Sequence, residues 1–227
     1  MARRRPAAPT PSAAIAAPVL VKFPPANLWR VHAAKYAPQQ FHQGSVGNAR
    51  FSPLWTASGK VVPTLYAAIS VAAAFMETVF HDVPTPPGDY ILDLTKLDDQ
   101  KLCVSTLRLE TELLLVDLST KGLQRLGLKR TDLIDTSARV YSLTREWAAW
   151  MHQVSPTAQG LLWTSRKDDD AKSLMLFGDR IRARSLTVVT PAQPINAVWR
   201  DELLDAAEHI GITQVFAPGL HENRSKR

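Results

Sequence analysis

The sequence lacks the paired cysteines of disulfide-bonded proteins and the long apolar runs of membrane proteins. Its 227 residues include a single cysteine, Cys103, which excludes an internal disulfide and is typical of a protein in the reducing cytoplasm. The apolar neighbours of Cys103 predict a buried structural thiol. No apolar run approaches the roughly 18 residues that span a bilayer, so we expect no membrane segment.

Common catalytic and binding signatures are also absent. No glycine-rich phosphate loop follows a predicted strand, no Gly-x-Ser-x-Gly elbow is present, and no two histidines have metal-ligand spacing. We interpret His32, His42 and His81 as surface or hydrogen-bonded histidines. The acidic run 168–170 lacks the glycine and distant glutamate of a calcium loop, so it predicts a solvated loop tip. The sequence therefore gives no metal site.

The positive charge is concentrated at the two ends of the chain. Of the formal net charge of +6, the run 3–5 contributes +3 and the segment 222–227 contributes +2, which leaves a nearly neutral body. We expect residues 1–22 and 221–227 to be disordered basic tails around one folded domain, 23–220. Prolines interrupt the first tail and argue against a targeting peptide. Direct nucleic-acid binding is not expected of a neutral body.

Hydrophobic periodicity predicts an α+β fold in a single mixed domain. Strands are expected at 28–32, 61–65, 90–94, 102–109, 113–118, 160–165, 173–177 and 186–189. Helices are expected at 70–80, 123–126, 137–152 and 196–210, and the segment 37–60 is rich in the glycines and prolines of a loop. In the third helix, Val140, Leu143, Trp147 and Met151 recur at helical spacing and should face the core.

One carboxylate lies in an otherwise apolar helix. Ser70 is placed to cap that helix, and the side chains from Val71 to Phe80 are almost all apolar or small except for Glu77. A buried carboxylate is costly unless another group pairs with it or the protein uses it. The alternative is that Glu77 lies on an exposed edge of the helix.

Four further polar residues have apolar surroundings, and together with Glu77 they suit one kind of ligand. The arginines Arg30 and Arg50 suit a diphosphate, because guanidinium donates in a planar fork. The ring of Tyr66 suits a flat cation such as nicotinamide. Glu77 suits a ribose hydroxyl and a developing oxocarbenium ion, and Ser165 suits the ribose or another nearby polar group. A purely structural role for each residue is the alternative.

Six short motifs carry a resemblance to a known family. They are 28–32 (LWRVH), 47–53 (GNARFSP), 65–67 (LYA), 73–77 (AAFME), 162–166 (LWTSR) and 174–180 (LMLFGDR). In this order and spacing, over roughly residues 27–190, they resemble the RES-domain family, the toxin half of RES–Xre toxin–antitoxin pairs. The family is named for an Arg, a Glu and a Ser, which match Arg30, Glu77 and Ser165. The loop 48–52 departs from the Gly-Gly-Arg-Trp-Asn pattern of many relatives. This departure affects the contacts expected of the loop and the preference for the molecule that accepts the ADP-ribosyl group.

The resemblance implies an ADP-ribosyltransferase-like fold and NAD⁺ as the substrate, cleaved between nicotinamide and ribose. It implies that Arg30 and Arg50 hold the diphosphate or ribose side and that Tyr66 orients the nicotinamide. Glu77 would stabilise the transition state, and Ser165 would complete the pocket. It also implies a protein partner, an Xre-type antitoxin that covers the pocket and forms an oligomer with the toxin.

The sequence leaves the acceptor of the ADP-ribosyl group open. Water and phosphate would make the protein a glycohydrolase or a phosphorylase that depletes NAD⁺. A protein side chain would make it an ADP-ribosyltransferase with a cellular target. A non-enzymatic module that binds nucleic acid or protein through the basic ends is a third alternative.

Overall fold

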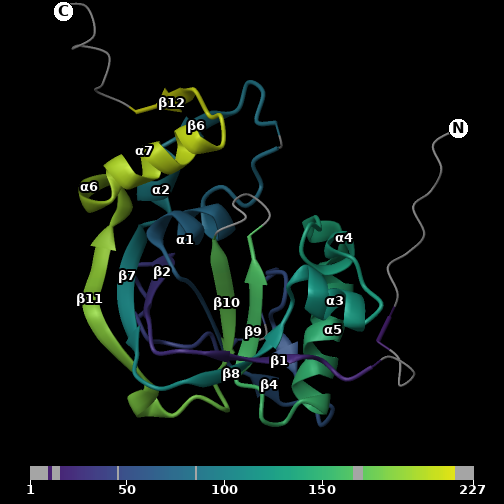
Figure 1. Cartoon of the computed structure of the whole chain (residues 1–227). Coiled ribbons are helices and arrows are strands. Elements are labelled where there is room, and N and C mark those ends of the chain that lie inside the picture. The colour runs from purple at the N-terminus through teal and green to yellow at the C-terminus, as the bar shows by residue number, and fades with distance from the viewer. Residues whose placement is uncertain (1–9, 12–15, 45, 85, 166–170, 218–227) are drawn as a thin grey trace, which may run out of the picture.

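Eight strands form one curled, mixed sheet, which the computed structural model shows in Figure 1. The structure describes residues 10–11, 16–44, 46–84, 86–165 and 171–217. The strand order is β1-β8-β9-β10-β5-β2-β7-β11, and within it only β8 and β9 run parallel. These strands are β1 (Leu20–Phe23), β2 (Asn27–Ala33), β5 (Thr64–Ala68), β7 (Leu102–Leu109), β8 (Leu113–Asp117), β9 (Gly160–Thr164), β10 (Lys172–Phe177) and β11 (Leu186–Pro194).

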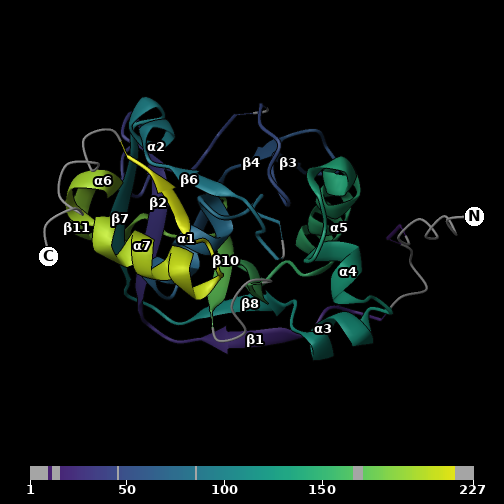
Figure 2. The same cartoon turned by 90° about the horizontal axis from the view of Figure 1, so that it is seen from above.

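Two short sheets and two groups of helices complete the domain. The short sheets pair β3 (Leu54–Trp55) with β4 (Val61–Val62) and β6 (Ile91–Asp93) with β12 (Gln214–Phe216). The helices are α1 (Val71–Thr78), α2 (Thr95–Asp99), α3 (Thr120–Arg125), α4 (Arg130–Leu133), α5 (Tyr141–Val154), α6 (Ile195–Val198) and α7 (Arg200–His209), with 3₁₀ turns at Ala138–Val140 and Ala183–Ser185. Seen from above, α1 lies between the α6–α7 group and the α3–α5 group (Figure 2). The predicted α+β class and single mixed domain are confirmed.

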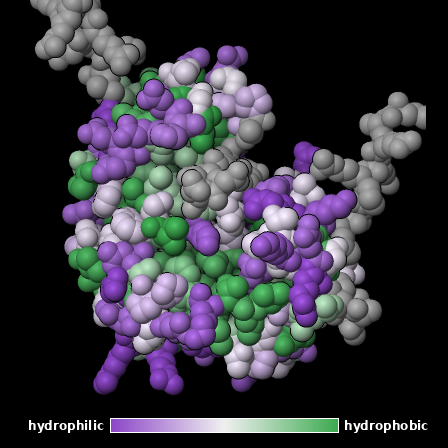
Figure 3. Space-filling model, viewed as in Figure 1, coloured by the Kyte–Doolittle hydropathy of each residue, from purple (hydrophilic) through white to green (hydrophobic). Residues whose placement is uncertain are grey.

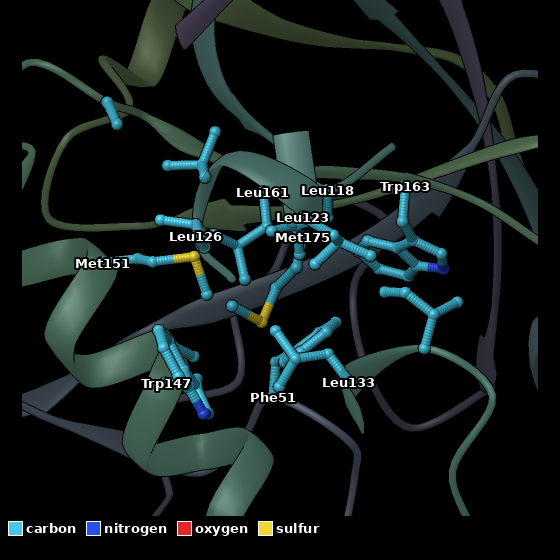
Figure 4. Packing of buried hydrophobic residues seen from close by; sticks show 14 of the residues in the cluster. Phe51, Leu118, Leu123, Leu126, Leu133, Trp147, Met151, Leu161, Trp163 and Met175 are labelled. Carbon is cyan, nitrogen blue, oxygen red and sulfur yellow. The ribbon is translucent and has the colours of Figure 1, made fainter. Parts of the chain in front are cut away.

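The two faces of the sheet bury different side chains, because successive residues of a strand point to opposite faces. On β10, Leu174 and Leu176 join one apolar cluster, whereas Met175 and Phe177 join another. The first cluster fills the inside of the curl. The second lies between the sheet and α3–α5, where Trp147 and Met151 of α5 meet Met175 (Figure 4). On the outside, hydrophilic side chains predominate over α7 and over α3–α5 (Figure 3).

The helix α1 begins as the sequence predicts. The Ser70 hydroxyl accepts a 3.1 Å hydrogen bond from the backbone N–H of Ala73, which satisfies one of the amides that the first turn leaves unpaired. Its buried residues are Ala73, Ala74, Phe75 and Met76. The far end of α5 is fixed by Arg180, which donates to the carbonyl oxygens of its last turn and the following loop at 2.7 to 2.8 Å.

Several boundaries differ from the prediction. Leu20–Phe23 is strand β1, paired with Val116–Leu113, so the predicted disordered tail is wrong for residues 20–22. The pairing partner lies about ninety residues away, and so short a strand shows no alternating pattern. Strand β11 continues to Pro194, because an edge strand tolerates proline. The predicted helix 196–210 divides at Trp199 into α6 and α7.

Other expectations are confirmed or fall outside the described residues. Cys103 is buried, as predicted. The acidic run 168–170, most of the predicted first tail and the predicted second tail lie outside the described residues. Within the part that the structure describes, no helix is both long enough and apolar enough to cross a membrane.

On the inner face of the curled sheet, Arg30 binds backbone carbonyl groups of the loop that follows β2. It shares that face of β2 with Leu28, and its Nη1 donates to the carbonyl oxygens of Pro38 at 2.6 Å and Gln40 at 2.8 Å. Burial lowers the pKa of Arg30 to about 10, so the guanidinium stays charged at neutral pH. The side chain therefore ties β2 to the loop that follows it.

We predict that Arg30→Ala destabilises the protein by about 2–3 kcal/mol, because two carbonyl oxygens lose a charged donor. Urea unfolding followed by circular dichroism measures the change. An unchanged midpoint would contradict the structural role. The activity of the folded variant tests the role in substrate binding that the resemblance implies, because a purely structural Arg30 leaves that activity intact.

Candidate active site

A cavity of about 490 Å³ opens between α1, the start of α5 and the outer face of the sheet. Its walls come from strands β2, β5, β9 and β10, from the loop before β3 and from the turn after α1. The lining residues are Trp29, Val31, Asn48, Ala49, Arg50, Tyr66, Ala67, Ala68, Ala74, Glu77, Thr78, His81, Asp82, Ala138, Tyr141, Trp163 and Ser173. The cavity thus combines aromatic rings, small side chains and a few charged groups, which is the usual composition of a small-molecule site.

An ion pair between Arg50 and Glu77 lies in this cavity. The Arg50 Nη1 donates to Glu77 Oε2 at 3.1 Å, and the two side chains are only 4% and 13% exposed. The alternative that Glu77 occupies an exposed edge of α1 is therefore wrong. Water screens a pair in this position weakly, so each charge fixes the position of the other.

The loop that carries Arg50 is fixed from two sides. The Thr144 hydroxyl on α5 donates to the carbonyl oxygen of Arg50. The phenol oxygen of Tyr66 accepts a 3.1 Å hydrogen bond from the backbone N–H of Phe51, which is fully buried. Both bonds hold the peptide group between Arg50 and Phe51, one at its carbonyl oxygen and one at its N–H, so Arg50 reaches Glu77 from a rigid support.

His81 extends the site by a chain of hydrogen bonds. Its Nδ1 lies 2.9 Å from a carboxylate oxygen of Asp82, and its Nε2 lies 2.7 Å from the hydroxyl of Tyr141 and 3.3 Å from Arg50 Nη2. Since a carboxylate only accepts, Nδ1 carries the hydrogen and Nε2 accepts. Burial, and to a lesser extent the positive charge of Arg50, lower the pKa of His81 against the opposing effect of Asp82. His81 is therefore a neutral imidazole at pH 7.

Tyr66 lines the cavity as a neutral phenol. Burial raises its pKa to about 12, against smaller opposing effects of its hydrogen bonds with Ser52 and Phe51. Its ring meets the indole of Trp163 edge to face, with centroids 6.2 Å apart. The hydroxyl is committed to the Arg50 loop, so the side chain can offer its ring to a ligand.

Two of the five predicted site residues lie outside the cavity lining. Arg50, Tyr66 and Glu77 come together as predicted, but Arg30 projects from the opposite face of the sheet. Ser165 is fully buried just beyond β9, where its backbone N–H donates to Ala171 at 2.8 Å. The roles that the resemblance implies for Arg30 and Ser165 stay predictions.

Sequence reasoning missed Tyr141 and undervalued His81. The predicted core face of α5 began at Val140 and Leu143, but Val140 is 39% exposed and Leu143 is half-buried. Trp147 and Met151 are buried as predicted, but the first turn of the helix buries Tyr141 and Thr144 instead. Thr144 contacts the Arg50 loop, and Tyr141 contacts His81. The signal for His81 was its position four residues after Glu77, in the turn that directly follows α1, which keeps the two residues near the same end of the helix.

The described residues hold no group of three or more His, Cys, Asp or Glu side chains arranged to bind a metal ion. The charged groups of the cavity pair with one another instead. A cofactor or substrate that fits here would therefore meet two carboxylates, those of Glu77 and Asp82, one guanidinium and several aromatic rings.

A comparison with protein families identifies the family to which the chain belongs. The RES domain matches residues 27–222, nearly the whole chain. The chain belongs to the RES-domain family. No curated protein matches it. The RES match extends beyond residue 190, where the sequence motifs end, and so includes α6, α7 and β12. Membership of the RES family is consistent with a toxin-like, NAD-related enzyme.

We predict that acid destabilises this RES domain through its buried histidines. Burial is the main cause that lowers the pKa values of His32, His81 and His152 below 6.5. Between those lowered values and 6.5 the unfolded chain binds more protons than the native one, so the free energy of unfolding rises with pH and falls on acidification. Urea unfolding at pH 7.5, 6.5 and 5.5 measures this slope.

Variants separate the histidines from other titrating groups. His32→Gln should flatten the slope, whereas His42→Gln, at an exposed site, should leave it unchanged. Stability that stays constant or increases as the pH falls from 6.5 to 5.5 would contradict the prediction.

Proposed function

We propose that the cavity binds NAD⁺ and that the protein cleaves the bond between its nicotinamide and ribose. The observation that carries this proposal is the carboxylate of Glu77, held by Arg50 at 3.1 Å inside a cavity lined by aromatic rings. A fixed negative charge beside flat apolar walls suits a cationic ring attached to a sugar. Membership of the RES family supports the same substrate.

The chemistry needs a fixed anion next to the anomeric carbon. When the bond between the pyridinium nitrogen and C1′ breaks, its electron pair moves to nitrogen and nicotinamide leaves as a neutral molecule. Positive charge then develops on the ribose as an oxocarbenium ion, as in glycoside cleavage. Glu77 would stabilise that charge, and its salt bridge to Arg50 keeps the carboxylate in place without reorganisation during the reaction.

The acceptor must lose a proton if it is water. His81 lines the same cavity as a neutral imidazole, and Asp82 fixes its tautomer through the 2.9 Å bond to Nδ1. Its Nε2 is therefore the candidate base for a water that displaces the Tyr141 hydroxyl from it and attacks C1′. Phosphate needs no such base. In the ADP-ribosyltransferase alternative the first step, cleavage of the bond to nicotinamide, is the same. The two alternatives differ only in the acceptor, which is a protein side chain in place of water.

The diphosphate would lie toward the mouth of the cavity. Arg50 lies inside the cavity, and its guanidinium is engaged by Glu77 and His81. At the rim, the partly exposed Arg145 donates a 3.0 Å hydrogen bond to Asn48, which lines the cavity. This cation supports a pose with nicotinamide inside and phosphates outside.

We predict that the wild-type protein releases nicotinamide from NAD⁺ and that Glu77→Gln lowers the rate by about 10² or more, because the anion facing the ribosyl cation is lost. Chromatography of free nicotinamide measures both rates, with and without phosphate. Glu208→Gln, on the exposed side of α7, is the matched control and should keep the wild-type rate. No release by wild type under either condition would refute the proposal.

We predict that His81→Ala lowers NAD⁺ hydrolysis by about 10²-fold and removes the acid limb of its pH profile, since general bases contribute rates of this order. The acid limb of the wild type should lie below pH 6.5, because the pKa of His81 is lowered from that value. His42→Ala serves as the control. Wild-type hydrolysis with an unchanged pH profile in His81→Ala would exclude this residue as the base.

A further inference from the structure

Four side chains form a row across the wall of the cavity. They belong to adjacent strands and are direct partners in the sheet: Trp29 on β2 opposes Ala68 on β5, Ala68 opposes Ser173 on β10, and Ser173 opposes Trp163 on β9. All four line the cavity. Because opposed residues of neighbouring strands point to the same face, the row is one continuous surface.

The row has small residues in its middle and large ones at its two ends, so its middle forms a recess. Two small residues, Ala68 and Ser173, lie between two indoles, and Ala74 of α1 packs on the Ala68 side. With strands about 4.8 Å apart, the backbones of Trp29 and Trp163 are separated by roughly 14 Å. Such a floor with aromatic ends accepts a flat ring, and a positively charged ring gains from the faces of the indoles.

The same row contains two buried polar atoms without a partner. Trp163 Nε1 and Ser173 Oγ make no hydrogen bond with any described residue, and the two residues are only 2% and 1% exposed. Figure 4 shows the indole nitrogen of Trp163 on the side away from Met175. Buried polar groups are normally hydrogen-bonded, so two neighbouring exceptions on a cavity wall indicate a ligand that satisfies both.

We propose that this row is the nicotinamide subsite and that Trp163 and Ser173 recognise the carboxamide. The inference rests on the proposed function and goes further, because it names the residues that select the leaving group. The indole N–H of Trp163 donates to the carboxamide oxygen, and Ser173 Oγ accepts from the carboxamide nitrogen. Glu77, in the same cavity, then faces the ribose side of the ring.

An analogue of NAD⁺ isolates each contact. The 3-acetylpyridine analogue keeps the carbonyl oxygen but has a methyl group in place of the amide nitrogen. Ser173→Ala should lower kcat/KM for NAD⁺ about 10-fold and change it less than about 3-fold for the analogue, which has no N–H to lose. Trp163→Phe should lower kcat/KM about 10-fold for both substrates, because both keep the acceptor.

Two control variants remove the same groups elsewhere. Trp199→Phe deletes another buried indole N–H without a described partner, in the apolar cluster with α7, and Ser185→Ala deletes another buried hydroxyl. Both should keep wild-type kcat/KM for both substrates. If Ser173→Ala lowers kcat/KM equally for NAD⁺ and the analogue, or matches Ser185→Ala, the subsite assignment is overturned even though the proposed function stands.

Binding of free nicotinamide tests the subsite separately from turnover. Calorimetry should detect nicotinamide binding to the wild-type protein and an affinity at least about 10-fold weaker for Ser173→Ala. This result would support the subsite even if the wild type releases no nicotinamide from NAD⁺, which would refute only the proposed reaction. Equal binding by the two proteins, or no binding by the wild type, would overturn the subsite.

Discussion

The salt bridge between Arg50 and Glu77 is the interaction on which the site depends. A helix as apolar as α1 can hold a carboxylate at 13% exposure only because a guanidinium lies 3.1 Å away. That guanidinium in turn needs a rigid backbone, which the hydroxyls of Thr144 and Tyr66 provide from α5 and β5. Helix α5 therefore meets the Arg50 loop, β5 and α1, which lie far before it in the sequence, at one pair of charges.

The curled sheet separates structural from candidate functional side chains. Trp29 and Arg30 are neighbours on β2, yet Trp29 lines the cavity and Arg30 holds a loop on the other face. The same alternation sends Trp163 and Ser173 toward the cavity and Leu162 and Leu174 into the apolar interior of the curl. A shift of one residue in the register of any of these strands would exchange the two sets.

Much of this arrangement could be predicted from the sequence, and the reasons are local. Ser70 and the apolar run behind it predict the start of α1, and the surroundings of Glu77 predict a carboxylate that needs a partner. The motifs predict that Arg50 and Tyr66 belong to the same site. Each of these signals lies within a few neighbouring residues.

What could not be predicted depends on long-range pairing. Trp147 and Met151 of α5 are buried as predicted, but its first turn buries Tyr141 and Thr144, and Thr144 bonds to the Arg50 loop, which lies far away in the sequence. The row from Trp29 to Trp163 exists only because β2, β5, β10 and β9 pair in one register. The pairing of β1 with β8 across the chain likewise has no local signal.

The central claim is that this cavity holds the nicotinamide end of NAD⁺ beside Glu77. A crystal structure of the Glu77→Gln variant with NAD⁺ tests it most directly. The account predicts the nicotinamide ring on Ala68 and Ser173, with C1′ of its ribose next to the substituted side chain and the diphosphate toward the mouth of the cavity. A dinucleotide bound on the Arg30 face of the sheet, or with its adenine in the cavity, would contradict the account.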